Sequence, residues 1–179
     1  MKKTLIGVFT LLMFLFIFLV YSGLFTKISV REMELGPYDL VYEDHIGSYN
    51  ESGKIFRRIH DALGKDFGIQ SERSFGIYHD NPRSVPVEKL RSELGFILDE
   101  KDAGRMDDLK AKFAVKKLER KKYAAVLFPY RNTVSIFIGI MRVYPRLSKY
   151  MKDKGYAVGY GFEIYDRSRK QSTYAFLIK

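Results

Sequence analysis

One glutamate stands inside an aromatic, strand-like stretch near the end of the chain. The stretch is YGFEIYD, residues 160–166, and Glu163 is at its centre. Side chains of a strand alternate between two faces, so Glu163 and Tyr165 share one face while Phe162 and Ile164 share the other. A carboxylate among tyrosines is costly to ionise unless a cation or a hydrogen-bond donor pairs with it. Such a residue could anchor a cationic or polar ligand, but the pattern alone favours a glutamate that faces water from a half-exposed strand.

The same frame occurs earlier in the chain without the charge. FGIY begins at Phe75 and FEIY at Phe162, and KDFG begins at Lys65 and KDKG at Lys152, so both matches are 87 residues apart. Two matches at one offset indicate an internal repeat. Gly76 takes the place of the glutamate in the first copy, and Tyr78 shares its face. A second glutamate there would repel the first, so one carboxylate serves both halves.

Little else in the sequence suggests catalysis. The three histidines, His45, His60 and His79, have no partner pattern, and the motifs H-E-x-x-H, C-x-x-C and G-x-x-x-x-G-K-[ST] are absent. The acidic residues between 99 and 108 lack the spacing of an EF-hand loop. We therefore expect no cofactor and no metal. If the protein is a hydrolase, Glu163 would be its general base, with Tyr165 or Tyr78 as proton donor.

Two amphipathic helices precede the two copies of the frame. The first has Ile55, Phe56, Ile59 and Leu63 on one face and ends at Gly68, as helices commonly do at a glycine. The second has an apolar face at helical spacing, formed by Ile136, Ile140, Tyr144, Leu147 and Met151. Pro145 lies inside this second run and should kink the helix or split it into two.

Strand patterns flank each helix, so each half reads as two strands, a helix and two strands. We expect a hairpin turning at Gly36-Pro37 in the first half and one turning near Arg120 in the second. The predicted class is α+β, with an antiparallel sheet, helices on one face and a cleft between the halves. Phe75, Ile77, Phe162 and Ile164 should pack under the helices, so that Glu163, Tyr165 and Tyr78 project from the opposite face.

The chain begins with a long uncharged segment. Residues 4–25 contain no charge, and about 20 apolar residues suffice to cross a bilayer. A cleaved signal peptide is the alternative, but its apolar region is usually about 7–15 residues long. We expect a single-pass anchor at 1–26 and a domain at 27–179, composed of a first repeat at 27–99, a connector at 100–112 and a second repeat at 113–179. Lys2 and Lys3 before the span favour a domain on the non-cytoplasmic face.

The positive charge is concentrated in one run. The chain carries +10 in total, and residues 110–122 hold six lysines, one arginine and one glutamate. Lysines on an edge strand block unwanted pairing between sheets, which we favour as the explanation of this run. Attraction to anionic lipid headgroups is the alternative. The run lacks a groove-reading helix or a stacking motif, so we expect no nucleic-acid partner. A protein partner cannot be inferred from these residues.

Three segments together resemble a known family. IGSYNESGKIFRRI, SFGIYHDNPRSVPVEKLRSELG and FEIYD are similar to the GyrI-like small-molecule-binding domains, which also form the effector-binding domains of AraC-type regulators. The resemblance covers about Ser29 to Lys179, and its most specific part is the D-N-P-x-x-V-P frame at residues 80–86. It implies a duplicated unit with a ligand cleft that a glutamate matching Glu163 lines. The implied binding residues are Glu163, Tyr165 and Tyr78. Tyr49, Phe128 and Tyr130 are candidate wall residues, and core packing explains these three equally well.

The resemblance also qualifies the function. Some details of the chain resemble a membrane-anchored member of this family that acts as an autophagy receptor, yet the chain ends at Lys179 within an expected strand. We therefore expect no autophagy-receptor role and no DNA-binding role. The expectation is a membrane-tethered domain that senses or sequesters a small molecule and is not an enzyme. The alternatives are a hydrolase that uses the same glutamate, and a membrane-tethered protein-interaction module.

Overall fold

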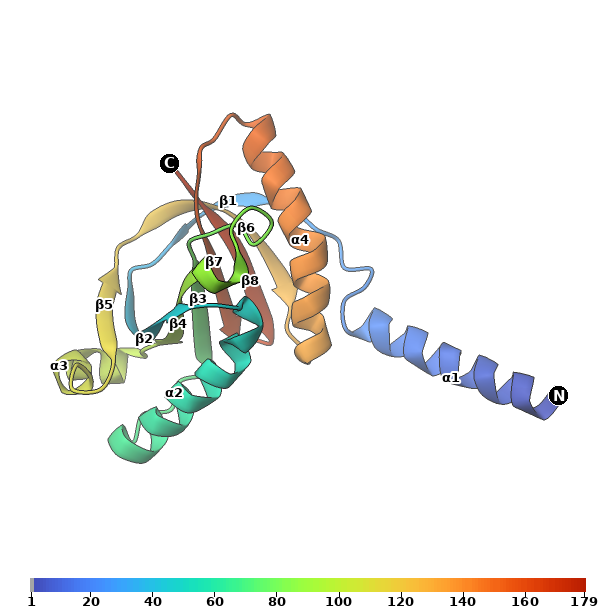
Figure 1. Ribbon diagram of the computed structural model, residues 1–179, viewed down its shortest axis with the longest axis horizontal. Helices are drawn as coiled ribbons and strands as arrows, with labels where there is room; N and C mark the ends of the chain where they lie inside the picture. Colours follow the sequence, from blue (N-terminus) through green and yellow to red (C-terminus); the bar gives the residue numbers. More distant parts are fainter. Residues whose placement is uncertain (1) are drawn as a thin grey trace.

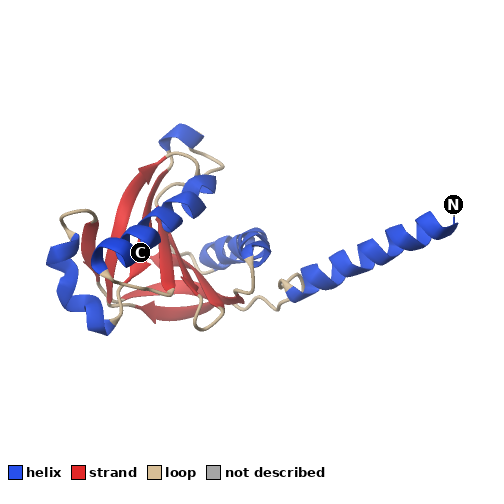
Figure 2. Ribbon diagram, turned by 90° about the horizontal axis from the view of Figure 1, so that it is seen from below, coloured by secondary structure: helices blue, strands red, loops and turns tan. Residues whose placement is uncertain are grey.

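The computed structural model describes residues 2–179, which form an N-terminal helix and a curled sheet with helices packed on it (Figures 1 and 2). The helices are α1 (Lys2–Tyr21), α2 (Ser52–Phe67), α3 (Met106–Leu109) and α4 (Thr133–Asp153), with short 3-10 helices at Tyr49–Glu51, Val87–Lys89 and Glu100–Arg105. The strands are β1 (Arg31–Leu35), β2 (Tyr38–Ile46), β3 (Arg73–Tyr78), β4 (Arg91–Ile97), β5 (Ala114–Leu118), β6 (Lys121–Pro129), β7 (Val158–Asp166) and β8 (Gln171–Ile178).

The internal repeat is present in the structure. Each half supplies two strands, a helix and two strands, in the order expected from the sequence. All eight strands form one antiparallel sheet in the order β1-β6-β8-β7-β3-β4-β2-β5. Exchanging the labels of the two halves reverses this order, so the halves are related by a pseudo-twofold axis between β3 and β7. The α+β prediction is confirmed.

The first strand of each half does not form the expected hairpin. β1 pairs with β6 of the second half, and β5 pairs with β2 of the first half. The connectors at Gly36-Pro37 and Glu119-Arg120 cross each other, and the Arg120 side chain donates a hydrogen bond of 3.2 Å to the Gly36 carbonyl. Gly36 has a φ of +99°, and a Cβ there would lie 3.1 Å from the Glu119 carbonyl oxygen. The hairpin prediction was wrong. In a strongly curled sheet the two edges come close together, so a two-residue connector can also join strands that lie at opposite edges.

The curled sheet encloses a core of its own. Residues from all eight strands meet on its inner face, among them Phe75, Ile77, Phe162 and Ile164. Helices are not needed to bury this face, because the curled strands pack against one another. α2 and α4 instead cover the outer face, α2 on β4 and β2, and α4 on β6 and β8. The apolar positions and the Glu163 positions do lie on opposite faces, as predicted, but the helices cover the glutamate side.

The two helices agree unequally with the sequence patterns. α2 buries Ile55, Ile59 and Leu63, as predicted, and Gly68 ends it with a φ of 66°. α4 is one continuous helix that contains Pro145, so of the two expected outcomes, a kink or a split, the split does not occur. Its buried face is also turned from the predicted one, and consists of Ser135, Ile138, Gly139, Val143, Leu147 and Met151. Ile140 is exposed, because small residues at 135 and 139 let the helix approach the sheet on another side.

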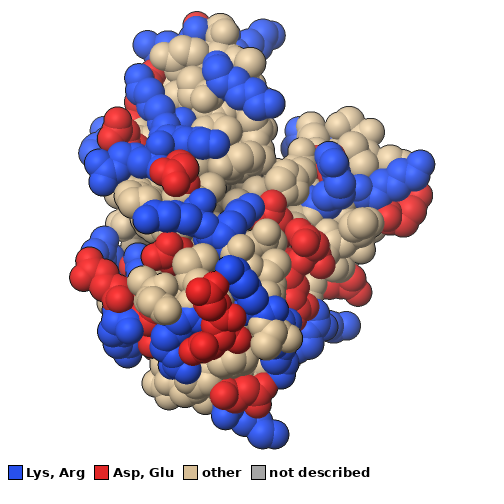
Figure 3. Space-filling view, turned by 90° about the vertical axis from the view of Figure 1, so that its left-hand side faces the viewer, with Lys and Arg blue, Asp and Glu red and all other residues tan. Residues whose placement is uncertain are grey.

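Most of the basic run lies along the edge of the sheet furthest from α1, and its last two lysines begin β6 beside the other edge strand, β1. β5 is an edge strand, and Figure 1 places it on the side of the domain opposite α1. Four lysines of the run pair with carboxylates: Lys110 with Asp107, Lys112 with Asp66, Lys116 with Glu93 and Lys122 with Glu32. Positive and negative side chains are interspersed over this side of the domain (Figure 3). The arrangement agrees with edge protection and gives no support to this run as a lipid contact.

Candidate functional site

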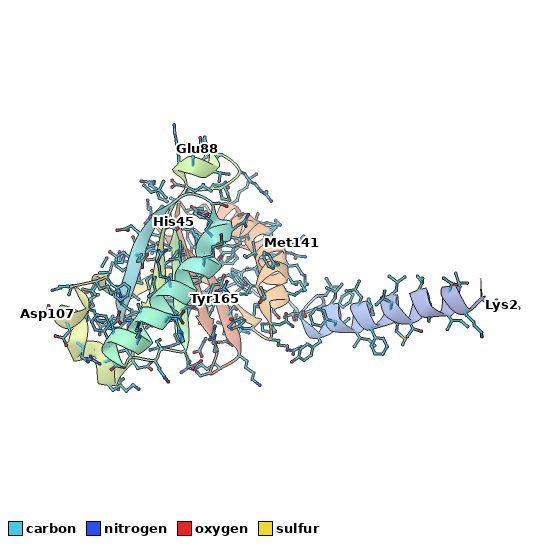
Figure 4. The ribbon with its side chains drawn as sticks, turned by 60° about the horizontal axis from the view of Figure 1, so that its bottom comes forward. Lys2, His45, Glu88, Asp107, Met141 and Tyr165 are labelled. Carbon is cyan, nitrogen blue, oxygen red and sulfur yellow. The ribbon has the colours of Figure 1, made fainter. Side chains whose placement is uncertain are left out.

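Glu163 lies on the central strand β7, on the face of the sheet that α2 and α4 cover. Its residue is only 3% exposed. Tyr144 of α4 and Tyr165 of β7 each donate a hydroxyl hydrogen bond to its carboxylate, one to each oxygen. Figure 4 shows Tyr165 between α2 and α4. The carboxylate therefore has two neutral donors, and no cation of residues 2–179 forms an ion pair with it.

The glycine of the first copy faces the glutamate directly. Gly76 and Glu163 occupy equivalent positions of the repeat, and they are cross-strand partners between β3 and β7. The pseudo-twofold axis therefore passes between them, and a second glutamate would lie directly opposite the first. The ring of Tyr78 fills the space above Gly76, where a Cβ would lie 2.7 Å from it. The position that differs between the two copies, glycine in one and glutamate in the other, thus brings the two residues together as direct neighbours.

Tyrosine rings cover the site from both sides. Tyr78 is half-buried, and its ring centre lies 4.8 Å from that of Tyr49. Tyr49 is fixed beside the D-N-P loop, since its hydroxyl donates to the carbonyl oxygens of Asp80 and Arg91 at 3.0 Å each. Tyr130 lies on the other side, with its ring centre 5.9 Å from that of Tyr165. Two of the predicted tyrosines, Tyr78 and Tyr165, therefore lie beside Glu163. Tyr49 packs on the ring of Tyr78, and Tyr130 packs on the ring of Tyr165.

Phe128 has the core position that was the alternative to a wall residue. It is 1% exposed and packs in the core beneath α4, where its ring centre is 6.3 Å from that of Tyr174. Its ring also touches Gly23 at the end of the N-terminal segment. Phe128 thus supports the wall of the site without facing the carboxylate.

Sequence reasoning missed three residues of the site. Tyr144 was expected only as part of an apolar helix face, and its hydroxyl is a direct partner of Glu163. Tyr174 is the cross-strand partner of Glu163 on β8, and its hydroxyl donates to the Ile136 carbonyl at 3.1 Å. Gly139 makes room for that ring, because a Cβ there would lie 2.4 Å from the Tyr174 hydroxyl. Gly139 within a helical pattern was the one available signal of a close approach.

Burial controls the protonation of this cluster. Burial raises the pKa of Glu163, and the hydrogen bonds from Tyr144 and Tyr165 lower it by less. Burial also raises the pKa of both tyrosines, and the nearby carboxylate raises it further. The tyrosines therefore remain neutral donors at physiological pH. A desolvated carboxylate with neutral partners gains most from a cation, which no described side chain supplies.

A second carboxylate on the same face has the opposite character. Glu32 of β1 accepts hydroxyl hydrogen bonds from Tyr150 at 3.2 Å and Tyr156 at 2.7 Å, and it pairs with Lys122. Its side chain is 24% exposed. Lys122, followed by Tyr156, lowers the pKa of Glu32 to about 2. Glu32 is therefore charged and already compensated.

The arrangement can bind a ligand but offers little for catalysis. Within residues 2–179 no three His, Cys, Asp or Glu side chains are placed to hold a metal ion. Glu163 has no histidine or lysine as a partner, and the tyrosines around it hold their protons firmly. A duplicated α+β domain with a tyrosine-covered carboxyl on its axis is the type of binding domain that the fold and this site define.

The chain belongs to the family of GyrI-like small-molecule-binding domains, whose pattern matches residues 28–175. It is 31% identical to testis-expressed protein 264 of Homo sapiens over 175 residues, which cover 92% of this chain and 54% of that protein. The chain thus spans about half the length of the curated relatives it matches. These matches confirm the family resemblance that the sequence motifs indicated.

Two solved structures share the fold. The C-terminal domain of EcmrR superposes with a TM-score of 0.59 at 12% identity, covering 85% of this chain and 98% of that one. SAV2435, described as bound to tetraphenylphosphonium, superposes with a TM-score of 0.56 at 12% identity, covering 84% of this chain and 94% of that one. At this identity the likeness establishes the fold alone.

Proposed function

We propose that this chain is a membrane-tethered receptor domain that binds an amphipathic cation at Glu163, between α2 and α4. The observation that carries the proposal is a buried carboxylate that, among residues 2–179, has tyrosine hydroxyls as its only side-chain partners. A bound cation would supply the missing charge, and the surrounding rings would add cation–π attraction. Membership of a small-molecule-binding family supports the same use of the site.

Ligand entry requires the tyrosines to move. α2 and α4 pack on the outer strands, so side chains, and not a helix, cover the central pair β3 and β7. Tyr78, Tyr130 and Tyr144 are half-buried, while Tyr165 and Tyr174 are buried. We therefore assign the first three to a cover that swings aside, and the other two to the floor. SAV2435, of the same fold, is described with a bulky aromatic cation, and a compound of that chemistry fits a site of this composition.

α1 would hold this domain at a membrane. It spans 20 residues, is exposed along its length, and is long and apolar enough to cross a bilayer. Lys2 and Lys3 form its N-terminal end, which favours the domain on the non-cytoplasmic face. Protease protection of the domain in sealed vesicles would test that orientation: digestion from the cytoplasmic side would refute it.

Binding is tested with the full chain in lipid nanodiscs. Tetraphenylphosphonium and a panel of aliphatic and aromatic ammonium compounds are titrated by calorimetry against the parent, Glu163→Gln and Glu32→Gln. We expect Glu163→Gln to weaken binding about 10–100-fold, as for loss of a charged hydrogen-bond partner. Glu32→Gln is the matched control and should bind like the parent, because Lys122 already neutralises that site.

The result also separates the alternatives. Equal affinity of Glu163→Gln and the parent would overturn the role of this carboxylate. Absence of binding by every cation in the panel would overturn the proposal and favour an interaction module. Conversion of a bound compound into product, followed by mass spectrometry, would instead identify an enzyme.

A further inference from the structure

The exposed surface of α4 changes character halfway along the helix. In the first half, Phe137, Ile140 and Met141 are 58%, 37% and 77% exposed. In the second half, the exposed residues are Pro145, Arg146, Ser148, Lys149, Lys152 and Asp153. An apolar surface confined to one half of a helix calls for an apolar environment at that end only.

The apolar half of α4 is the half joined to α1. Arg131 donates to the Tyr21 carbonyl and lies over the Tyr21 ring at 4.9 Å. Asn132 donates to the Ser22 hydroxyl at 3.0 Å, and Arg142 donates to the Gly23 carbonyl at 2.9 Å. These bonds satisfy carbonyl groups at the end of α1 and fix it against the start of α4. α4 runs crosswise to α1, and Met141 lies on the α1 side of the domain (Figures 1 and 4).

Other side chains around this junction suit a lipid surface. Phe25 and Leu127 are exposed there as well, at 67% and 42%. A hollow of about 330 Å³ lies beside the end of α1, and its lining includes the cations Arg131, Arg167 and Lys170. The other lining residues are Tyr21, Tyr130, Asn132 and Thr133. Apolar side chains flanked by Arg, Lys and Tyr are the composition of an interfacial element, with the cations at the depth of lipid phosphates.

We propose that the first half of α4 lies on the bilayer, with Phe137, Ile140 and Met141 among the acyl chains and Arg131, Arg167 and Lys170 at the headgroups. This inference rests on α1 spanning the membrane, as proposed above. The bilayer is the favoured occupant because α1 would bring it to this end of α4, and because the exposed apolar residues stop where the helix leads away from α1. The domain would then contact the membrane through α4, the same helix that positions Tyr144 beside Glu163.

The test uses the absence of cysteine from the chain. Met141→Cys, Ser148→Cys and Asp107→Cys are prepared separately and labelled with a fluorophore in the full chain in nanodiscs. Ser148 lies on the polar half of α4, and Asp107 lies on α3, on the side of the domain away from α1. Lipids with nitroxide-labelled acyl chains should quench the label at 141 several-fold more than the label at 107, with the label at 148 between them.

A second change checks that the apolar face causes the contact. Phe137→Asp in the Met141→Cys background should reduce quenching at 141 towards the level at 107, while circular dichroism remains that of the parent. Quenching at 141 no greater than at 107, in a chain that co-elutes with the nanodiscs, would overturn the inference and leave the tether standing. Failure to co-elute would refute the tether itself. Energy transfer between labels at 141 of two chains would assign the face to a second copy instead of lipid.

Discussion

Glu32 and Glu163 are held in nearly the same way, yet they differ in charge balance. Each accepts two tyrosine hydroxyl hydrogen bonds, and in each case one tyrosine comes from α4, Tyr150 for Glu32 and Tyr144 for Glu163. Glu32 is partly exposed and paired with Lys122, which lowers its pKa to about 2. Glu163 is buried without a cation, and burial raises its pKa. The comparison teaches that two tyrosine donors do not offset the desolvation of the buried Glu163, whereas partial exposure and an ammonium partner together keep Glu32 charged.

The largest expected effect comes from adding a second carboxylate at the buried site. Gly76→Glu places it directly opposite Glu163 and displaces the ring of Tyr78. We expect the free energy of unfolding to fall by about 3–5 kcal/mol, from buried like charges and overpacking together. Urea denaturation of the full chain in detergent, followed by near-UV circular dichroism of the tyrosines, measures it. Gly76→Ala is the control for packing alone, and an equal loss in both variants would show that charge contributes nothing.

A smaller effect follows from moving α4, which bears on both carboxylates. Gly139→Ala puts a Cβ 2.4 Å from the hydroxyl of Tyr174, a fully buried ring that cannot swing away. We expect a loss of about 1–3 kcal/mol in the same denaturation experiment. Gly64→Ala on α2 is the matched control, since nothing lies near that Cβ. It should gain about 0.5–1 kcal/mol from helix propensity, and a loss of similar size in both would contradict the close packing of α4.

The pH dependence of stability should have opposite signs at the two sites. The folded-state pKa of Glu163 lies above 4.5, so its contribution is full below pH 4.5 and is lost as pH rises through the folded pKa. Glu163→Gln should remove this loss, which has a slope of up to about 1.4 kcal/mol per pH unit. The folded-state pKa of Glu32 is about 2, so its contribution is present above 4.5 and is lost towards pH 2. Glu32→Gln should remove only the loss of stability at acidic pH. The free energy of unfolding measured from about pH 2 to pH 8 distinguishes the two variants.

The smallest effect concerns the ammonium group itself. Lys122→Met removes the first cause of the low pKa of Glu32, which should then titrate closer to 4.5. Carboxyl carbon NMR shifts of Glu32 and Glu163 would follow the change. Glu163 should not respond, because Lys122 is not among its partners. An unchanged titration of Glu32 would show that its two tyrosines alone set its pKa.

Sequence patterns predicted the elements better than their contacts. The offset of 87 residues between Gly76 and Glu163 correctly indicated a duplication, because local patterns repeat with local structure. The pairing of β1 with β6 could not be predicted, since Gly36-Pro37 suits a hairpin as well as a crossing. The face that the helices cover was also wrong, because alternation separates two faces without saying which one a curled sheet encloses. Tyr144 escaped notice for a related reason, since its role depends on the rotation of α4 about its axis.

The exchange of first strands has a consequence for how the molecule holds together. The edge strand of each half pairs with a strand of the other half, β1 with β6 and β5 with β2. The two halves also pair directly through β3 and β7. The chain thus has the topology of a swapped homodimer fused through residues 100–112. A cut in that segment would leave two fragments joined along three ladders, so they should reassemble as a complementing pair. Because the two repeats are interlocked within one chain, we expect them to unfold as a single cooperative unit.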